Sequence, residues 1–593
     1  MCGICGELRF DKAPADQAAL SRMLKVLVPR GPDSGDTFVE GSLAFGHRRL
    51  AIIDLSDRSS QPMVDNETGN VLVFNGTIYN YKALRADLVK RGHRFTSEGD
   101  TEVILKSYAQ WGEQCVQHFS GMFAFVIWNK RKRELFMARD RLGIKPLYYT
   151  QDRDRFRFAS NPQALLAGGG IDTELDSVAL HHQLTLHAVV PAPRTVLTHV
   201  RKVEPATTLT LTTDGKEKHN RYWHIHACRP EQNRSAEEWV DAIHVSLREA
   251  VDRRRLAADV PVGVLLSGGL DSSLLVALLA EAGQSDLHTF SVGFEDQPEE
   301  KGNEFEFSDQ VVERYGTRHH KFLVPNNAVL ENLPDAVDHM AEPMVGQDAV
   351  AFYLLSQRVS EEVKVVQSGQ GADEVFGGYF WYPRMAAERG EYIDRFRKHY
   401  FDRSHDEVLA ALEPKWHGLD YTSALIDKRL HREGADTFMD QVLRMDVDTL
   451  IVDDPVKRVD NMTMAWGLEA RVPFLDHDLV ELAMQMPPEM RLREDGKYPL
   501  KAIARDLLPH SIIDRPKGYF PVPALKFVRG PFLDFMRDIL GSEACRRRGL
   551  FQQAYVDQLL AAPDRHLTPL MGSKLWHIAL LEFWLQRNVD PHS

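Results

Sequence analysis

The sequence predicts two α/β units in one chain: a strand-rich α+β region, followed by a doubly wound parallel sheet that ends in a helical part. Three observations support this prediction. A chain of 593 residues is too long for a single hydrophobic core. In the first third, apolar runs typical of strands lie between helical patterns at residues 15–27 and 81–90. From residue 261 to residue 367, short apolar runs alternate with helical patterns, which favours a parallel sheet.

Composition excludes several classes of function. A hydrophobic content of 43% and a charged content of 26% are ordinary for a soluble globular protein. The net charge of −13 argues against a nucleic-acid or anionic-membrane partner, and no apolar segment approaches the ~20 residues of a membrane span. Five cysteines and an N-terminus without a secretory signal fit a reducing compartment. We therefore expect a cytoplasmic protein that binds neither nucleic acid nor membrane.

The second residue is the first catalytic candidate. The small side chain of Cys2 permits removal of Met1, and the chain would then begin with a cysteine that carries a free α-amino group. That amine has a reference pKa of about 7.7–8.0, so it can act as a general base for the adjacent thiol. A redox or zinc pair with Cys5 is the alternative, but no second pair at ligand spacing accompanies it. The position alone does not decide between these uses.

Five short motifs follow Cys2 in order through the strand-rich region. They are Arg30-Gly-Pro-Asp33, Gly46-His-Arg-Arg-Leu50, Phe74-Asn-Gly-Thr-Ile-Tyr-Asn80, Gly99-Asp-Thr-Glu102 and Gly121-Met-Phe-Ala-Phe125. Together with Cys2 they resemble the N-terminal-nucleophile (Ntn) glutaminase domain of class II glutamine amidotransferases. The resemblance implies a four-layer αββα sandwich over residues 2–205, with glutamine as a substrate.

The same resemblance implies roles for individual residues. Asn75 and the backbone N–H of Gly76 would form an oxyanion hole, while Arg49 would bind the α-carboxylate of glutamine and Asp100 its ammonium. The family usually has Asn-Gly-Glu, and that glutamate helps to hold the ammonium, whereas this chain has Thr77. Either Asp100 and backbone carbonyls suffice, which we favour, or glutamine binds more weakly.

A connector and a helix lead to the second unit. Residues 206–234 are assigned to the connector. Ser235 and Glu238 form a capping box that opens a helix to about Leu256, and the second unit is assigned to residues 235–530. Residues 531–593 are predicted as a C-terminal extension of surface helices, without a usable motif.

A Gly-Gly turn between a strand and a helix forms the centre of the second unit. Residues 261–266 predict a buried strand, and the helix that begins at Ser272 has Gly283 placed to cap its end. The turn directs backbone N–H groups and the helix dipole at a bound anion, and Asp271 adds a carboxylate that Mg²⁺ can bridge to phosphate. Ser-Gly-Gly-x-Asp-Ser resembles the pyrophosphate loop of enzymes that split ATP into AMP and pyrophosphate. The resemblance implies a phosphate site at Leu266, Ser267, Gly268, Gly269, Asp271, Ser272 and Ser273.

Two further predicted strands also end in motif residues. Residues 287–294 include Val292, and residues 361–367 run into Ser368-Gly-Gln-Gly-Ala-Asp373. In doubly wound sheets, ligands bind beyond the carboxyl ends of the strands, so we expect Val292, Ser368 and Gly369 beside the nucleotide. Asp373 could then share Mg²⁺ with Asp271.

Later motifs extend the likeness to about residue 525. Arg458 to Asp476, Gly496-Lys497-Tyr498 and Arg515-Pro-Lys-Gly518 resemble the C-terminal half of glutamine-hydrolysing asparagine synthetases. Lys497, and more weakly Lys517, are candidates to meet phosphate charge. The pairing implies amide synthesis: Cys2 releases ammonia from glutamine, and the second unit joins a carboxylate to AMP. Ammonia then attacks the acyl-adenylate, so the two units should dock closely and enclose its path.

The acceptor carboxylate is the open question. Asparagine synthetases usually carry Glu or Asp where this chain has Gln370, and a glutamine side chain cannot pair with an ammonium group as a carboxylate does. Either another acid takes that role, or the acceptor lacks a free α-ammonium. A related subgroup amidates N-acetylglutaminylglutamine, and we favour an acceptor of that kind over aspartate.

Other classes fit less well. A tRNA-modifying enzyme with the same ATP loop would need a basic face and extra cysteine chemistry, whereas a β-lactam-forming relative would lack the Cys2 nucleophile. In a sensing or storage protein without activity, Asn75, Asp271 and Asp373 would not need to be intact. A homodimer is compatible with the resemblance, but the sequence itself does not give the oligomeric state.

Overall fold

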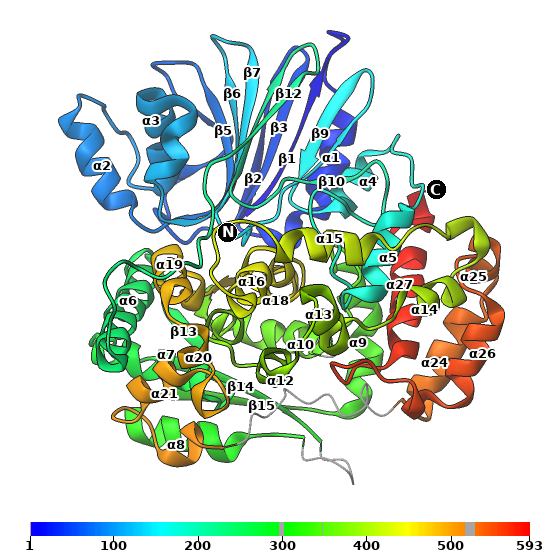
Figure 1. Ribbon diagram of the computed structural model, residues 1–593. Coiled ribbons are helices and arrows are strands. Elements are labelled where there is room, and N and C mark those ends of the chain that lie inside the picture. Colours follow the sequence, from blue (N-terminus) through cyan, green and yellow to red (C-terminus); the bar gives the residue numbers. More distant parts are fainter. Residues whose placement is uncertain (1, 296–301, 347, 516–527, 593) are drawn as a thin grey trace.

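The computed structural model describes residues 2–295, 302–346, 348–515 and 528–592. The strand-rich N-terminal unit packs along one side of a larger unit that holds the remaining helices and the third sheet (Figure 1). Among the described residues, no helix combines the length and the apolar character needed to cross a membrane.

Two antiparallel six-stranded sheets make up the N-terminal unit. The first has the strand order β10-β8-β9-β1-β3-β2 and the second β12-β11-β7-β6-β5-β4. The strands of the first sheet are β1 Cys2–Arg9, β2 Ser34–Glu40, β3 Leu43–Arg49, β8 Tyr148–Gln151, β9 Arg155–Ala159 and β10 Arg201–Lys202. Those of the second are β4 Met63–Val64, β5 Val71–Ile78, β6 Gly121–Asn129, β7 Glu134–Arg139, β11 Thr207–Thr212 and β12 Glu217–Arg221.

Helices cover the outer faces of both sheets. Side chains such as Ile4, Phe45, Val73 and Val126 form the core between the sheets, and every one of them is buried. Helices α1 (Gln17–Val26) and α4 (Pro162–Gly168) pack on the first sheet, while α3 (Asp100–Trp111) packs on the second, with α2 (Tyr81–Lys90) beside it. The expected four-layer αββα sandwich is therefore confirmed.

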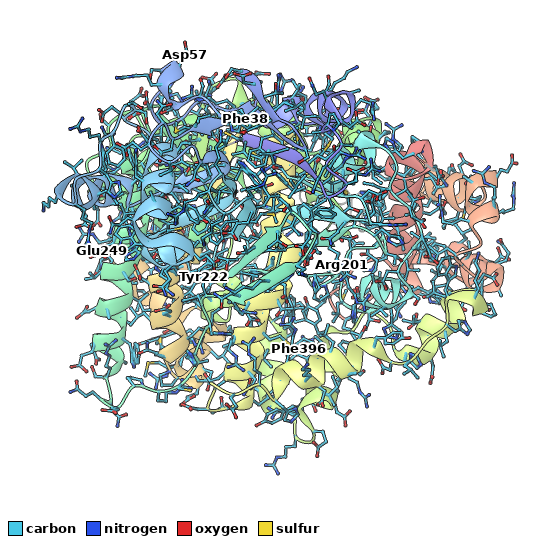
Figure 2. The ribbon with its side chains drawn as sticks, turned by 90° about the horizontal axis from the view of Figure 1, so that it is seen from above. Phe38, Asp57, Arg201, Tyr222, Glu249 and Phe396 are labelled. Atoms are coloured by element: carbon cyan, nitrogen blue, oxygen red, sulfur yellow. The ribbon has the colours of Figure 1, made fainter. Side chains whose placement is uncertain are left out.

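The second sheet continues beyond residue 205. Strands β11 and β12 pair with each other, and β11 also pairs with β7, so the N-terminal unit extends into the segment that the sequence assigned to the connector. Tyr222, labelled in Figure 2, fastens the chain as it leaves β12: its hydroxyl donates to the carbonyl of Arg139 at 2.8 Å. Helix α6 (Ala236–Leu256) follows, and both hydrogen bonds of the predicted capping box are present.

A parallel five-stranded sheet with the order β15-β14-β13-β16-β17 forms the centre of the second unit. Its strands are β13 Val262–Leu265, β14 His288–Phe294, β15 Arg318–Val324, β16 Val365–Gln367 and β17 Glu469–Arg471. Neighbouring residues such as Val264 and Leu265 belong to two different core clusters, because successive side chains of a strand point to opposite faces. The sheet is thus covered on both faces, and the doubly wound prediction is confirmed.

The C-terminal helices are α24 (Pro531–Leu540), α25 (Glu543–Arg548), α26 (Gln553–Ala561) and α27 (Lys574–Asn588). The expectation of surface helices is wrong for α27. Its indole groups, on Trp576 and Trp584, are buried and donate to the carbonyls of Val345 and Met340 at 3.1 and 2.7 Å. A helix with apolar residues all round its axis is stable only when it is packed on all sides, and α27 lies against α9 (Asn326–Asp338) and α24.

Buried ion pairs join the two units. Asp460, on α18 (Pro455–Met464), accepts from Arg30 at 2.9 Å and from Lys145 at 3.1 Å. Lys202 contacts Glu342 at 2.8 Å. All five side chains are buried, and removing one partner of such a pair typically costs about 3–5 kcal/mol. The units therefore dock closely, as expected from the sequence.

Two candidate active sites and the strand between them

The first candidate site lies where β1 and β5 meet. The backbone N–H of Cys2 donates to Asn75 Oδ1 at 3.1 Å, and β1 pairs Cys2 with Arg49 of β3. Burial raises the pKa of the Cys2 thiol, and Arg49 offsets this rise only in part. A thiol in this state needs a base to become a nucleophile, and the α-amino group of a chain that begins at Cys2 is such a base.

Asn75, which contacts the backbone of Cys2, and Gly76 follow one another on β5. Asn75 is fully buried, and its Nδ2 has no hydrogen-bond partner within the described parts of the chain. An unsatisfied buried donor typically costs about 1–3 kcal/mol, so such groups occur where function requires them. Gly76 has a φ of +153°, and a Cβ at this position would lie 2.2 Å from the carbonyl oxygen of Met122. The backbone can take this course only with glycine.

Asp100 and Arg49 also belong to the first site, and both already form hydrogen bonds within the protein. Asp100 opens α3 and accepts from the N–H of Ile78 at 3.0 Å, and burial together with the charge of Glu469 raises its pKa to about 6. Arg49 already donates to the carbonyl of Ser56 at 2.9 Å, so it also shapes the adjacent loop. The first site thus combines the guanidinium of Arg49 with an acid whose pKa is about 6.

Thr77 contacts a residue from the other unit. Its hydroxyl donates to Glu469 Oε1 at 3.2 Å, and Glu469 pairs with Arg471 at 2.6 Å. Burial would raise the pKa of Glu469, but Arg471, the N-terminal amine and Lys145 together lower this pKa to about 2. This permanently ionised carboxylate raises the pKa of both Cys2 and Asp100. A carboxylate therefore stands beside Thr77 after all, supplied by β17.

Sequence reasoning did not identify Glu469. The residue lies within one of the later motifs, but nothing in its sequence context shows that β17 reaches the first site. The available signal was a charged pair, Glu469 and Arg471, separated by one residue inside an otherwise apolar stretch, Leu468 to Leu475. Charges in such a setting are rarely buried without a partner or a function.

The second candidate site begins at the turn after β13. Residues 267–269 join this strand to α7 (Leu270–Glu281), as predicted, and Gly268 has a φ of +77°. The hydroxyl of Ser272 accepts from the N–H of Ser267 at 3.1 Å, which holds the turn closed. Leu266 donates to the carbonyl of Phe290 at 2.7 Å, so the strand ends remain in register. Ser273, on the inner face of α7, is buried.

Three charged groups converge beside this turn. Lys497 Nζ lies 2.6 Å from Asp271 and 2.7 Å from Asp373, although the three residues come from distant parts of the chain. Burial would lower the pKa of Lys497, but the two carboxylates outweigh it and raise the pKa. Gly378 lies against both Asp373 and Lys497, since a Cβ there would be 2.2 Å from each side chain. The predicted convergence of Asp271 and Asp373 is present, and a lysine now stands between them.

The strand order explains this convergence. The chain runs from β13 to β14 and β15 on one side, then returns to β16 and β17 on the other. The turns after β13 and β16 are therefore neighbours, and a Cβ on Gly369 would lie 3.1 Å from the Cβ of Asp271. Ser368 directly follows β16, and Val292 lies in the last part of β14, so both are toward the carboxyl ends of the strands, where ligands of doubly wound folds bind.

Gln370 lies in the turn between β16 and α11 (Ala372–Phe376) and is partly exposed. Two acids lie nearby in the fold. Glu374 accepts from the hydroxyl of Tyr379 at 2.7 Å, and burial together with Glu374 raises the pKa of Asp446 to about 8. Lys517, the weaker phosphate candidate, lies outside the described residues.

Comparison with known proteins matches both units. The model of the glutamine amidotransferase domain family matches residues 1–223, and that of the asparagine synthase family matches residues 242–586. Asparagine synthetase [glutamine-hydrolyzing] 1 of Bacillus subtilis (strain 168) is 31% identical and covers 100% of this chain and 97% of its own. Asparagine synthetase B of Escherichia coli (strain K12) is 27% identical over 88% of this chain and 82% of its own.

Proposed function

The chain belongs to the glutamine-hydrolysing asparagine synthetase family, and from this membership we propose a reaction for each of its two sites. It is a ligase that forms C–N bonds, a glutamine-dependent amidotransferase of the asparagine synthetase type. Members of this family use ATP. Its substrates are glutamine, as the ammonia donor, and a carboxylate acceptor.

At the first site, the Cys2 thiol attacks the amide carbon of glutamine and its proton passes to the Cys2 α-amine. Asn75 Nδ2 and the N–H of Gly76 stabilise the oxyanion, ammonia leaves, and water hydrolyses the thioester. Arg49 holds the α-carboxylate and Asp100 the ammonium of glutamine. The proposal is supported by the Cys2–Asn75 hydrogen bond and by the unpartnered Nδ2 of Asn75 in the described part of the chain.

At the second site, an oxygen of the acceptor carboxylate attacks the α-phosphorus of ATP and pyrophosphate leaves. Ammonia then attacks the acyl carbon and AMP leaves. Asp271 and Asp373 fit a magnesium ion, because both carboxylates approach one position and Mg²⁺ prefers oxygen ligands. When bound, Mg²⁺ neutralises phosphate charge. Lys497 binds the phosphates, together with the turn and strand-end residues Leu266, Ser267, Gly268, Gly269, Ser272, Ser273, Val292, Ser368 and Gly369.

One observation carries the coupling of the two reactions. Strand β17 begins at Glu469, which contacts Thr77 beside the glutaminase site, and ends at Arg471, whose carbonyl accepts from the N–H of Ser368 at 2.9 Å. Three residues of strand span only about 10 Å. A short buried strand thus links the source of ammonia with the loop that holds the acceptor, and the path of ammonia follows it.

The acceptor we propose is a carboxylate without a free α-ammonium, of the N-acetylglutaminylglutamine class. Gln370 supplies no negative charge, Tyr379 already donates to Glu374, and the pKa of Asp446 is about 8, so Asp446 is largely neutral at pH 7. Aspartate is the second candidate, favoured by the names of the relatives, which are asparagine synthetases.

A panel of carboxylates with ATP and ammonia, scored by pyrophosphate release, separates these acceptors. We expect release with N-acylated glutaminyl dipeptides and little with aspartate. Gln370→Glu should shift the preference toward aspartate. Formation of asparagine from aspartate at full rate, without pyrophosphate release from any N-acylated dipeptide, would make aspartate the acceptor.

A further inference from the structure

Three side chains that neither proposed reaction uses form a compact cluster. His187 lies in the loop after α5 (Ser177–Thr185), Asp402 follows α13 (Tyr392–Tyr400), and His577 lies in α27. The neighbouring backbone draws these segments together: the N–H of Asp402 donates to the carbonyl of Thr185 at 2.9 Å. Arg403 donates to the carbonyl of Lys574, also at 2.9 Å. The cluster therefore joins the end of the glutaminase unit to the buried C-terminal helix.

The atoms of the cluster meet as ion pairs that are longer than ordinary charge-assisted hydrogen bonds. Asp402 Oδ2 lies 3.3 Å from Nδ1 of His187 and 3.3 Å from Nδ1 of His577. Within the described ranges of the chain, neither oxygen of Asp402, neither nitrogen of His577 and not Nδ1 of His187 makes a hydrogen bond. The carboxylate is fully buried, and a buried charge without hydrogen bonds is costly. A cation bound between the three side chains would offset this cost.

The distances within the cluster also fit a metal site. A charge-assisted hydrogen bond between an imidazolium and a carboxylate is about 2.7–2.9 Å long. Two ligands at about 2.0–2.1 Å from a tetrahedral zinc ion are separated by about 3.3–3.4 Å. Both contacts of Asp402 have the second length, and the three ligand atoms lie within 4.8 Å of one another.

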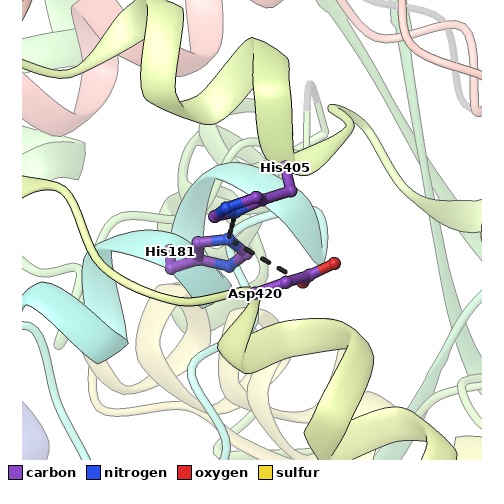
Figure 3. Close-up of side chains that lie close together, drawn as sticks. All are labelled: His181, His405 and Asp420. Carbon is purple, nitrogen blue, oxygen red and sulfur yellow. Dashed lines mark hydrogen bonds and ion pairs between the residues drawn. The ribbon is translucent and has the colours of Figure 1, made fainter.

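A second cluster with the same composition behaves differently. Figure 3 shows His181, His405 and Asp420, whose side chains also gather at one point. Here His181 Nε2 and His405 Nδ1 are hydrogen-bonded at 3.0 Å, and His181 Nδ1 bonds the Thr422 hydroxyl at 2.6 Å. Asp420 caps α15 (Tyr421–Leu430) by accepting from the N–H of Ser423 at 3.0 Å. These groups are satisfied by the protein itself, which makes this cluster a matched control.

We propose that His187, Asp402 and His577 bind one structural Zn²⁺ ion that ties the loop after α5 to α27. Two imidazoles and one carboxylate suit zinc, whereas Mg²⁺ prefers an all-oxygen set, so this ion is distinct from the one that accompanies ATP. Gly572 packs against the rings, since a Cβ there would lie 3.0 Å from His577 Nε2. A water molecule takes the fourth tetrahedral position.

Metal analysis of the full-length protein tests the proposal. The chain is purified without a histidine tag, incubated with Zn²⁺, dialysed, and analysed by inductively coupled plasma mass spectrometry. We expect about one zinc per chain, at least tenfold less in Asp402→Asn and His577→Gln, and no change in His405→Gln. Absence of zinc from the wild-type chain, or an equal loss in His405→Gln, would overturn the proposal.

Cobalt substitution separates loss of the site from loss of the fold. Co²⁺ in a tetrahedral site of nitrogen and oxygen ligands absorbs visible light, whereas hydrated Co²⁺ absorbs weakly. We expect this absorption in the wild type and in His577→Asp, which keeps a ligand, but not in His577→Gln with a native circular dichroism spectrum. Equal absorption by a natively folded His577→Gln would exclude His577 as a ligand. If His577→Gln does not fold, the proposal is tested by the zinc content of the wild type and of His405→Gln, which should both be about one ion per chain.

Discussion

The side chains of the two proposed active sites are held in position in different ways. In the glutaminase site the backbone sets the positions of the groups: β1 and β5, which belong to different sheets, place Cys2 beside Asn75, and Gly76 adopts a φ that only glycine accommodates. In the synthetase site opposite charges hold one another, with Lys497 between Asp271 and Asp373. In the proposed reaction, the first site would offer the unpartnered Nδ2 of Asn75 to a neutral amide. The second site would exchange internal ion pairs for contacts with ATP.

This difference predicts how each site responds to change. The first site, whose groups are positioned by the backbone, should lose function when a single reacting atom is removed, while its surroundings stay in place. A charge-balanced site responds to neutralisation of any one of its members, because the remaining charges then lack their partner. Strand β17 belongs to the second unit, but its residue Glu469 contacts Thr77 of the first. Substitution of Glu469 therefore tests whether the two sites are independent.

The largest effect is expected at the nucleophile. Cys2→Ala should lower glutamine-dependent amide formation by at least about a thousandfold, because no other group in the site can attack the amide carbon. Amidation with added ammonia should stay within about twofold of the wild type. Both rates are measured by pyrophosphate release.

Cys5→Ala is the matched control, since Cys5 lies buried on the same strand and outside the site. It should retain both activities. Glutamine hydrolysis that survives in Cys2→Ala would show that another residue is the nucleophile.

Neutralising the synthetase carboxylates should have the next largest effect. Asp271→Asn and Asp373→Asn should each lower ATP–pyrophosphate exchange by roughly 10²–10³-fold, because charge on the leaving pyrophosphate loses its support. Glutamine hydrolysis should remain measurable in both variants. Asp309→Asn, which removes an exposed carboxylate paired with Lys321, should change neither rate. Normal exchange in either site variant would contradict the two-carboxylate magnesium site.

Much of this arrangement could be predicted from the sequence, because it is local. Residues close in the sequence determine the strand–turn–helix at residues 262–281, the capping box of α6 and the strands around Asn75. The structure places these elements within a few positions of the predictions. Glu469 could not be predicted in the same way. Strand β17 has three residues, two of them charged, and it becomes a strand only because β16 pairs with it. The burial of α27 and the His187–Asp402–His577 cluster likewise depend on contacts between segments far apart in the chain.

Glu469→Gln tests whether β17 couples the sites. We expect kcat/KM for glutamine to fall about tenfold, because the site loses a buried carboxylate near the position of the substrate ammonium, which corresponds to about 1.4 kcal/mol. Ammonia-dependent amidation should change less. Glu361→Gln, at an exposed position, is the control. An unchanged ratio of glutamine-dependent to ammonia-dependent rates would show that Glu469 is only structural.

The smallest effect is a pH dependence at Asp100. Because burial and Glu469 raise its pKa to about 6, this acid is ionised at pH 7.5 and mostly protonated at pH 5. The carboxylate form pairs with the glutamine ammonium, so KM for glutamine should rise as pH falls through 6, approaching tenfold per pH unit below it. KM for ammonia, calculated as free NH₃, should lack this step. In Glu469→Gln the step should move to lower pH, since one raising charge is gone.

The same residue links function to stability. A carboxyl whose folded pKa lies above its unfolded value near 3.8 favours the folded state in its protonated form, so folding stability falls as pH rises from about 4 to 6. The rise of the pKa from 3.8 to about 6 corresponds to a loss of folding stability of roughly 3 kcal/mol at pH 7. Asp100→Asn should therefore raise the free energy of unfolding at pH 7 while weakening glutamine binding, and the gain should vanish below pH 4. Denaturant unfolding at both pH values measures it, and a variant that is less stable at pH 7 would show that the carboxylate of Asp100 stabilises the fold.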